Sequence, residues 1–167
     1  MSALQRIFML AALYFFLAAC SSTHETPSRP DRSKAFVNND EFRGIYFKEN
    51  SPQGEEAIHS ALSTTLGDSR LALAHDLELI KKFNKDEKFR VVGFTDNVEC
   101  QASDCNALSL RRAKAFQDWL IGKGISATRF YPPRGYGSAR PIGNNLTEVG
   151  RATNRRAHIS YGSDLDN

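Results

Sequence analysis

The chain has 167 residues, of which 41% are hydrophobic and 25% charged, and its formal net charge is +3. This length suffices for one ordinary hydrophobic core with appendages and excludes a large multidomain protein. The segment from Arg111 to Arg156 holds ten lysines and arginines against two acidic residues. A solvated basic surface accounts for most of these side chains, and an export signal at the N-terminus argues against a nucleic-acid partner.

Residues 1–19 have the features of a signal peptide, with Arg6 ahead of an apolar run, Ile7–Leu17, that is too short to span a bilayer. The run leads into Leu-Ala-Ala-Cys, ending at Cys20, which resembles the bacterial lipoprotein processing box. That resemblance implies cleavage before Cys20 and its modification by acyl chains such as palmitate. Ser21 at the next position implies sorting to the outer membrane.

The mature chain is expected to begin with a tether. Residues 20–40 are polar, contain prolines and lack periodicity, which predicts an acylated, flexible segment. About twenty such residues average roughly 25 Å end to end and stretch to about 70 Å. Residues 41–162 form the predicted globular domain, and residues 163–167 form an acidic, disordered tail.

The domain is expected to alternate strands and helices. Residues 50–67 leave two alternatives open, an extra helical turn or the first strand. Asp68 or Ser69 is the expected cap of the helix that ends at Phe83. The predicted strands are 42–47, 89–94, 128–131 and 157–161, and the other predicted helices are 108–121 and 151–156. Residues 144–150 are predicted to be a loop.

The residues around the second strand are the candidate binding site. Thr95 and Asp96 follow this buried strand directly, and Arg112 lies on the next helix beside its apolar stripe. An acid and an arginine facing one another suit a zwitterionic ligand, whose ammonium and carboxylate they would hold. An internal salt bridge between Asp96 and Arg112 is the alternative, because an arginine beside a core needs a partner.

Two of the three cysteines lie close together in the loop between Asp96 and this helix. Cys100 and Cys105 are separated by four residues, while Cys20 stands apart. One close pair of cysteines and one distant cysteine favour a Cys100–Cys105 disulfide in an exported chain. Zinc is the alternative, but it needs further cysteines or histidines nearby, and the sequence has none there. We therefore predict no metal site.

Several motifs in order resemble the OmpA-like peptidoglycan-binding domain family. The resemblance implies a two-layer α/β fold with helices packed on one mixed four-stranded sheet. It also implies that Asp96 and Arg112 hold diaminopimelate of the peptidoglycan stem peptide, assisted by Thr95, Asn106 and Arg155. The matching segments are Gly93–Asp96, Leu108–Ala113, Gly135–Gly137 with Pro141, Asn145–Arg151 and Asn154–Arg156.

The sequence departs from the family pattern in the loop between Asp96 and Leu108. The family carries Asn three residues before the motif leucine, where this chain has Cys105, and Asn106 comes one residue later. A glycine of the family's loop is also missing from the run between Asp96 and Cys105. These departures affect the loop's expected contact with the peptide.

Together these features predict a non-catalytic outer-membrane lipoprotein whose periplasmic domain binds peptidoglycan, similar in layout to peptidoglycan-associated lipoproteins. No cofactor is expected. A peptidoglycan hydrolase is the first alternative, although the sequence lacks a nucleophile elbow and histidine-rich zinc spacing. A scaffold lipoprotein of a secretion or Tol-like envelope complex is the second, with envelope proteins as further partners.

Overall fold

The computed structural model describes residues 41–99 and 104–162. The predicted signal peptide, Cys20, the tether, Cys100 and the acidic tail therefore lie outside the described residues. In this part of the chain, no helix is long and apolar enough to cross a membrane.

The described strands form one mixed sheet of four. They are β1 (Ile45–Tyr46), β2 (Phe89–Gly93), β3 (Arg134–Gly135) and β4 (Arg156–Tyr161), in the order β1-β4-β2-β3. β2 runs parallel to β3, whereas β4 is antiparallel to both β1 and β2. The mixed four-stranded sheet expected from the sequence is thus confirmed.

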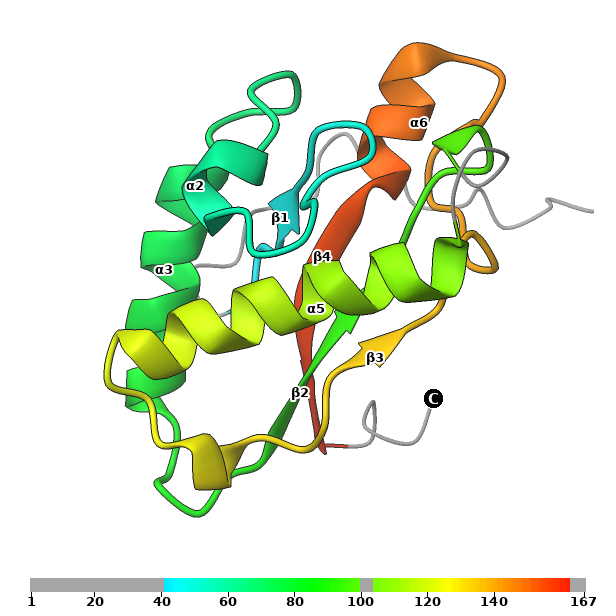
Figure 1. Ribbon diagram of the computed structural model, residues 1–167. Helices are drawn as coiled ribbons and strands as arrows, with labels where there is room; N and C mark the ends of the chain where they lie inside the picture. Colours follow the sequence, from blue (N-terminus) through cyan, green and yellow to red (C-terminus); the bar gives the residue numbers. More distant parts are fainter. Residues whose placement is uncertain (1–40, 100–103, 163–167) are drawn as a thin grey trace, which may run out of the picture. The chain divides into compact units, whose positions relative to one another are not determined.

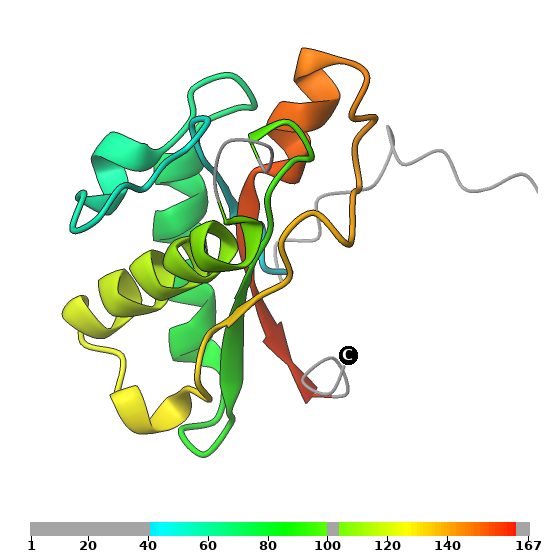
Figure 2. The ribbon, with the colours of Figure 1, turned by 45° about the vertical axis from the view of Figure 1, so that its right-hand side comes forward.

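Helices cover one face of this sheet. The two long helices, α3 (Ser69–Lys82) and α5 (Cys105–Gly122), lie on the same side of it (Figures 1 and 2). Leu73 and Ile80 of α3 and Phe116 and Leu120 of α5 are fully buried in a core shared with β2 and β4. This arrangement confirms the predicted two-layer α/β architecture. The short helices are α2 (Ile58–Ala61), α6 (Glu148–Asn154) and a 3-10 helix, η2 (Ala127–Arg129).

Side-chain caps fix where the long helices begin. The Asp68 carboxylate accepts hydrogen bonds from the backbone N–H groups of Arg70 and Leu71, as the predicted cap requires. Asp104 caps α5 in the same way through Asn106 and Ala107. The helix consequently begins at Cys105, three residues before the predicted start at Leu108, because Asp104 satisfies the first free N–H groups.

The predicted third strand, Thr128–Tyr131, is right only in its second half. Thr128 and Arg129 belong to η2, where the Ser126 hydroxyl accepts a hydrogen bond from the Thr128 N–H. Phe130 forms a parallel bridge with Phe89, and the Tyr131 N–H donates to the Phe89 carbonyl. β3 lies a few residues later, at Arg134–Gly135, and pairs with Val92 and Gly93 of β2. Two residues carry no readable periodicity, so only the pairing with β2 identifies this strand.

The structure also defines residues 50–67 and the start of the last short helix. Residues 50–67 contain the helix α2, while the first strand lies before them at Ile45–Tyr46. The last short helix, α6, begins at Glu148 within a segment predicted to be a loop, because the Thr147 hydroxyl accepts a hydrogen bond from the Gly150 N–H.

Two glycines let α5 lie very close to the sheet. A Cβ atom on Gly93 would lie 2.0 Å from the backbone oxygen of Ser109, and one on Gly135 would lie 2.5 Å from the Leu110 nitrogen. No side chain fits at either position without moving backbone. This close approach brings the start of α5, including Arg112, to the carboxyl end of β2.

Candidate functional site

The candidate site is built on the residues that follow β2. Thr95 and Asp96 are both buried, and the Thr95 N–H donates to the carbonyl of Gly137. One Asp96 oxygen, Oδ1, accepts the backbone N–H groups of Val98 and Glu99 at 2.6 and 2.9 Å. Asp96 therefore shapes the turn that carries Glu99 back toward the domain interior.

Arg112 lies at the centre of the site and is completely buried. Its Nη1 and Nη2 bond the two carboxylate oxygens of Glu99 at 2.5 and 2.9 Å, which is a two-pronged ion pair. Burial lowers the pKa of Arg112, and the hydrogen bonds to Glu99 only partly offset that effect. Glu99, which we did not predict, is thus the acid that compensates the buried guanidinium.

Asp96 pairs with a different arginine. Its second oxygen, Oδ2, accepts a hydrogen bond from Arg155 Nη1 at 2.8 Å. Arg155 Nη2 donates in turn to Glu148 at 2.7 Å. The alternative of a direct Asp96–Arg112 salt bridge is therefore wrong among the described residues: these two charges lie in one network, but each has its own partner.

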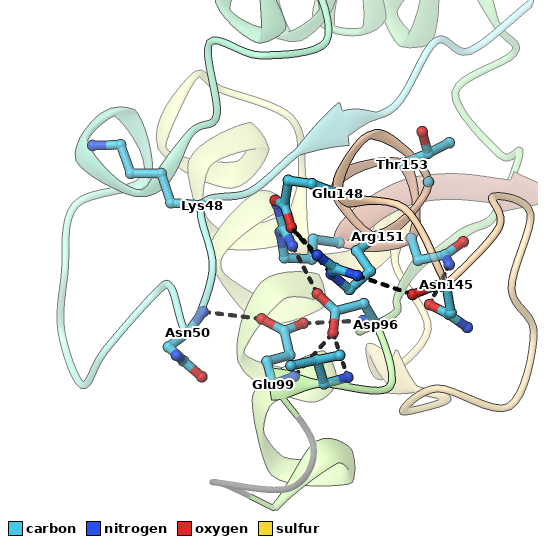
Figure 3. A network of polar contacts seen from close by, with 12 residues as sticks. Lys48, Asn50, Asp96, Glu99, Asn145, Glu148, Arg151 and Thr153 are labelled. Carbon is cyan, nitrogen blue, oxygen red and sulfur yellow. Dashed lines mark hydrogen bonds and ion pairs between the residues drawn. The ribbon is translucent and has the colours of Figure 1, made fainter.

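The network runs from the interior to the surface. Figure 3 shows the Asp96 and Glu99 carboxylates near one another, with Glu148 and Arg151 on one side and Asn50 approaching Glu99 on the other. The Glu148 side chain is 57% exposed, and its hydrogen bond from Arg155, followed by that from Arg151, lowers its pKa despite partial burial. Glu148 marks the end of the network that solvent reaches.

Arg155 joins these two halves and keeps one polar atom without a partner. Burial acts to lower the pKa of Arg155, but its hydrogen bonds to Glu148 and Asp96 together raise it. Its Nε is buried and has no hydrogen-bond partner among the described residues. Arg155 thus holds an N–H group that a nearby acceptor would satisfy.

The remaining predicted residues lie at the edge of this network. Asn106 is exposed in the first turn of α5, and its side-chain oxygen lies about 3.0 Å from where a Cβ atom on Gly137 would be. Cys105 is the first residue of α5, but Cys100 lies outside the described residues, so the Cys100–Cys105 disulfide remains a prediction. Within residues 41–99 and 104–162 no group of three or more His, Cys, Asp or Glu side chains could hold a metal ion.

Three predicted residues, Asp96, Arg112 and Arg155, lie in this network, whereas two of the three acids that pair with the arginines, Glu99 and Glu148, were not predicted. Glu99 is the only acidic residue between Asp96 and Asp104, which was a usable signal. Glu148 sits in a segment predicted to be a loop, and nothing in its surroundings in the sequence indicates an ionic partner.

Comparisons with known proteins agree with this architecture. Residues 46–155 match the model of the OmpA family. Outer membrane protein A of Bordetella avium is 32% identical over 78% of this chain and 58% of its own length. A peptidoglycan-binding protein of Mycobacterium tuberculosis, ArfA, is 36% identical over 44% of this chain and 22% of its own. The chain therefore spans less than two thirds of either relative.

A solved structure shows the same fold. The peptidoglycan-associated lipoprotein from Burkholderia pseudomallei superposes with a TM-score of 0.54 and 20% identity, over 72% of this chain and 90% of that one. The family model covers most of the domain that the structure describes, including β2, α5 and α6. The chain belongs to the OmpA family.

Proposed function

We propose that this chain binds peptidoglycan non-covalently through the diaminopimelate of its stem peptide and so links the outer membrane to the cell wall. The observation that carries the proposal is the buried charge network at the end of β2, which contains Asp96, Arg112 and Arg155. Membership of the OmpA family supports it, as do the names of two similar proteins, one called peptidoglycan-binding and the other peptidoglycan-associated.

The chemistry of the network suits a zwitterionic ligand. Asp96 would accept hydrogen bonds from an ammonium group, and Arg112 would hold a carboxylate in its planar fork. Thr95 precedes Asp96, and Asn106 lies against Gly137, whose carbonyl accepts the Thr95 N–H. Arg155 offers the N–H group that lacks a partner among the described residues. Because both arginines already hold acids of the chain itself, a ligand must compete with internal ion pairs.

Sedimentation with purified sacculi tests the proposal. The full chain should co-sediment, and free diaminopimelate should release it. Asp96→Ala should weaken binding roughly 10- to 150-fold, which is the loss of one charge-assisted hydrogen bond. Asp118→Ala is the matched control, because Asp118 is an exposed acid on α5 that pairs only with Lys114 among the described residues.

Thermal melting of the same samples separates binding from folding. An Asp96→Ala chain that stays folded and still sediments like wild type would rule out the proposed role of Asp96. Failure of the wild-type chain to co-sediment with sacculi would overturn the proposed function.

We further propose that a lipid at Cys20 anchors the chain in the outer membrane, with residues 20–40 as tether and the domain in the periplasm. Its support is the sequence of residues 1–21. Several acyl chains together give a durable anchor, since each buried methylene contributes about 0.8 kcal/mol. Mass spectrometry of the mature N-terminus should find an acylated Cys20, and an unmodified cysteine would contradict the anchor.

The proposed activity is binding without a chemical reaction. Sacculi incubated with the chain should release no soluble fragments, whereas a hydrolase would release them. Co-purification from the envelope would identify any protein complex in which the chain takes part.

A further inference from the structure

The guanidinium of Arg112 has no hydrogen-bond donor left for a ligand. An arginine offers five N–H groups. Two of them go to Glu99, as described above, and the other three go to backbone oxygens: Nε to Ser51 at 2.8 Å, Nη1 to Phe94 at 2.9 Å and Nη2 to Lys48 at 3.1 Å. The two bonds to Glu99 are therefore the ones in which Arg112 binds a side chain and not the backbone.

The Glu99 carboxylate is held as a bound ligand carboxylate would be. Besides the fork of Arg112, its Oε1 accepts the Asp96 N–H at 3.1 Å and its Oε2 accepts the Asn50 N–H at 2.9 Å. Its side chain is fully buried. An arginine fork and two backbone N–H groups form a complete site for one carboxylate, and Glu99 fills it.

We propose that Glu99 is a built-in occupant of the carboxylate site on Arg112, and that a ligand carboxylate binds there only by displacing it. The identity of the ligand rests on the proposed function, whereas the competition between carboxylates does not. Glu99 lies in the run from Asp96 to Cys105 that lacks the family's glycine.

The energetic consequence is a lowered apparent affinity. Because Glu99 is tethered three residues from Asp96, it competes at a high effective concentration and needs no free ligand. A ligand meets an open site only in the fraction of molecules in which Glu99 has left, and its dissociation constant rises by the inverse of that fraction. Removing the Glu99 charge should therefore strengthen binding.

Chemical rescue tests the site without peptidoglycan. Full-length wild type and Glu99→Ala are melted in sodium acetate and in sodium chloride at equal ionic strength and pH 7. Acetate should raise the melting temperature of Glu99→Ala above its value in chloride, because acetate fills the vacated site and binds only the folded state. Wild type should show no such difference, and neither should Glu99→Ala/Arg112→Ala, which lacks the fork. An equal response to acetate in all three chains would overturn the proposal.

Sacculus binding tests the competition itself. Glu99→Gln keeps an oxygen toward Arg112 but loses the charge, so it serves where Glu99→Ala is too unstable to use. Either variant, when folded, should bind sacculi about tenfold more tightly than wild type, as expected when one charge-assisted competitor is removed. Unchanged or weaker binding by a folded variant would overturn the proposal. If no chain binds sacculi, the proposed function fails, and the acetate comparison alone decides whether Glu99 occupies a carboxylate site.

Discussion

The inner and outer ion pairs of the network use the same chemistry in different surroundings. The inner pair, Arg112–Glu99, is fully buried at both ends, and all five arginine donors are bonded. The outer pair, Arg155–Glu148, joins a buried arginine to an acid that is 57% exposed. Arg155 also retains a buried Nε without a partner among the described residues.

Burial therefore decides how strongly each of these arginines depends on its acidic partner. Desolvating an ion pair costs several kcal/mol per charge, and only close hydrogen bonds offset that cost. The inner pair therefore resists the loss of either partner, whereas solvent can replace much of the outer pair. Three substitutions test this contrast in order of decreasing effect.

Arg112→Ala should have the largest effect on stability. It leaves the Glu99 carboxylate buried and uncompensated and removes three hydrogen bonds to backbone oxygens. We expect the free energy of unfolding to fall by about 3–5 kcal/mol, measured by urea denaturation. Arg111→Ala is the control, because Arg111 is only half-buried and bonds the Pro52 carbonyl alone among the described residues. Similar losses of unfolding free energy in both variants would contradict the special contribution of the buried Arg112–Glu99 pair.

Gly93→Ala should disturb the inner pair from a distance. The added Cβ would lie 2.0 Å from the Ser109 backbone oxygen, so β2 and α5 must separate. Overpacking of this kind costs about 1–3 kcal/mol, and the shift also pulls Arg112 away from Phe94. Gly122→Ala is the matched control, since it meets nothing within 4 Å at the end of α5. Equal melting temperatures for the two variants would contradict the close approach.

Glu148→Gln should have the smallest effect, below about 1 kcal/mol at pH 7, because exposed ion pairs are weak. The folded-state pKa of Glu148 lies below its ordinary value of 4.5. Its stabilising contribution is therefore present above that pH and is lost as the pH falls through the folded-state pKa. The difference in unfolding free energy between wild type and Glu148→Gln should begin to close as the pH falls below the ordinary value of 4.5 and vanish below the folded-state pKa. A gap that widens in acid would reverse this assignment.

Features that depend on local chemistry could be predicted from the amino-acid sequence. The buried strand at Phe89–Gly93 and the last strand at Arg156–Tyr161 follow from alternation, and the start of α3 follows from its Asp68 cap. Asp96 and Arg112 were predicted from their places after a buried strand and on the next helix, together with the family motifs. Each of these features is encoded within a few neighbouring residues, so no knowledge of distant contacts was needed.

The strand order, the place of β3 and the pairing of the charges depend on contacts between distant parts of the chain. Arg112 and Glu99 are 13 residues apart, and Arg155 and Asp96 are 59 apart. Which acid pairs with which arginine depends on how closely α5 packs on β2. Gly93 permits this close packing, but a glycine in the sequence does not predict it. A buried charge takes the partner that the backbone brings within hydrogen-bonding reach, and that geometry exists only after the chain has folded.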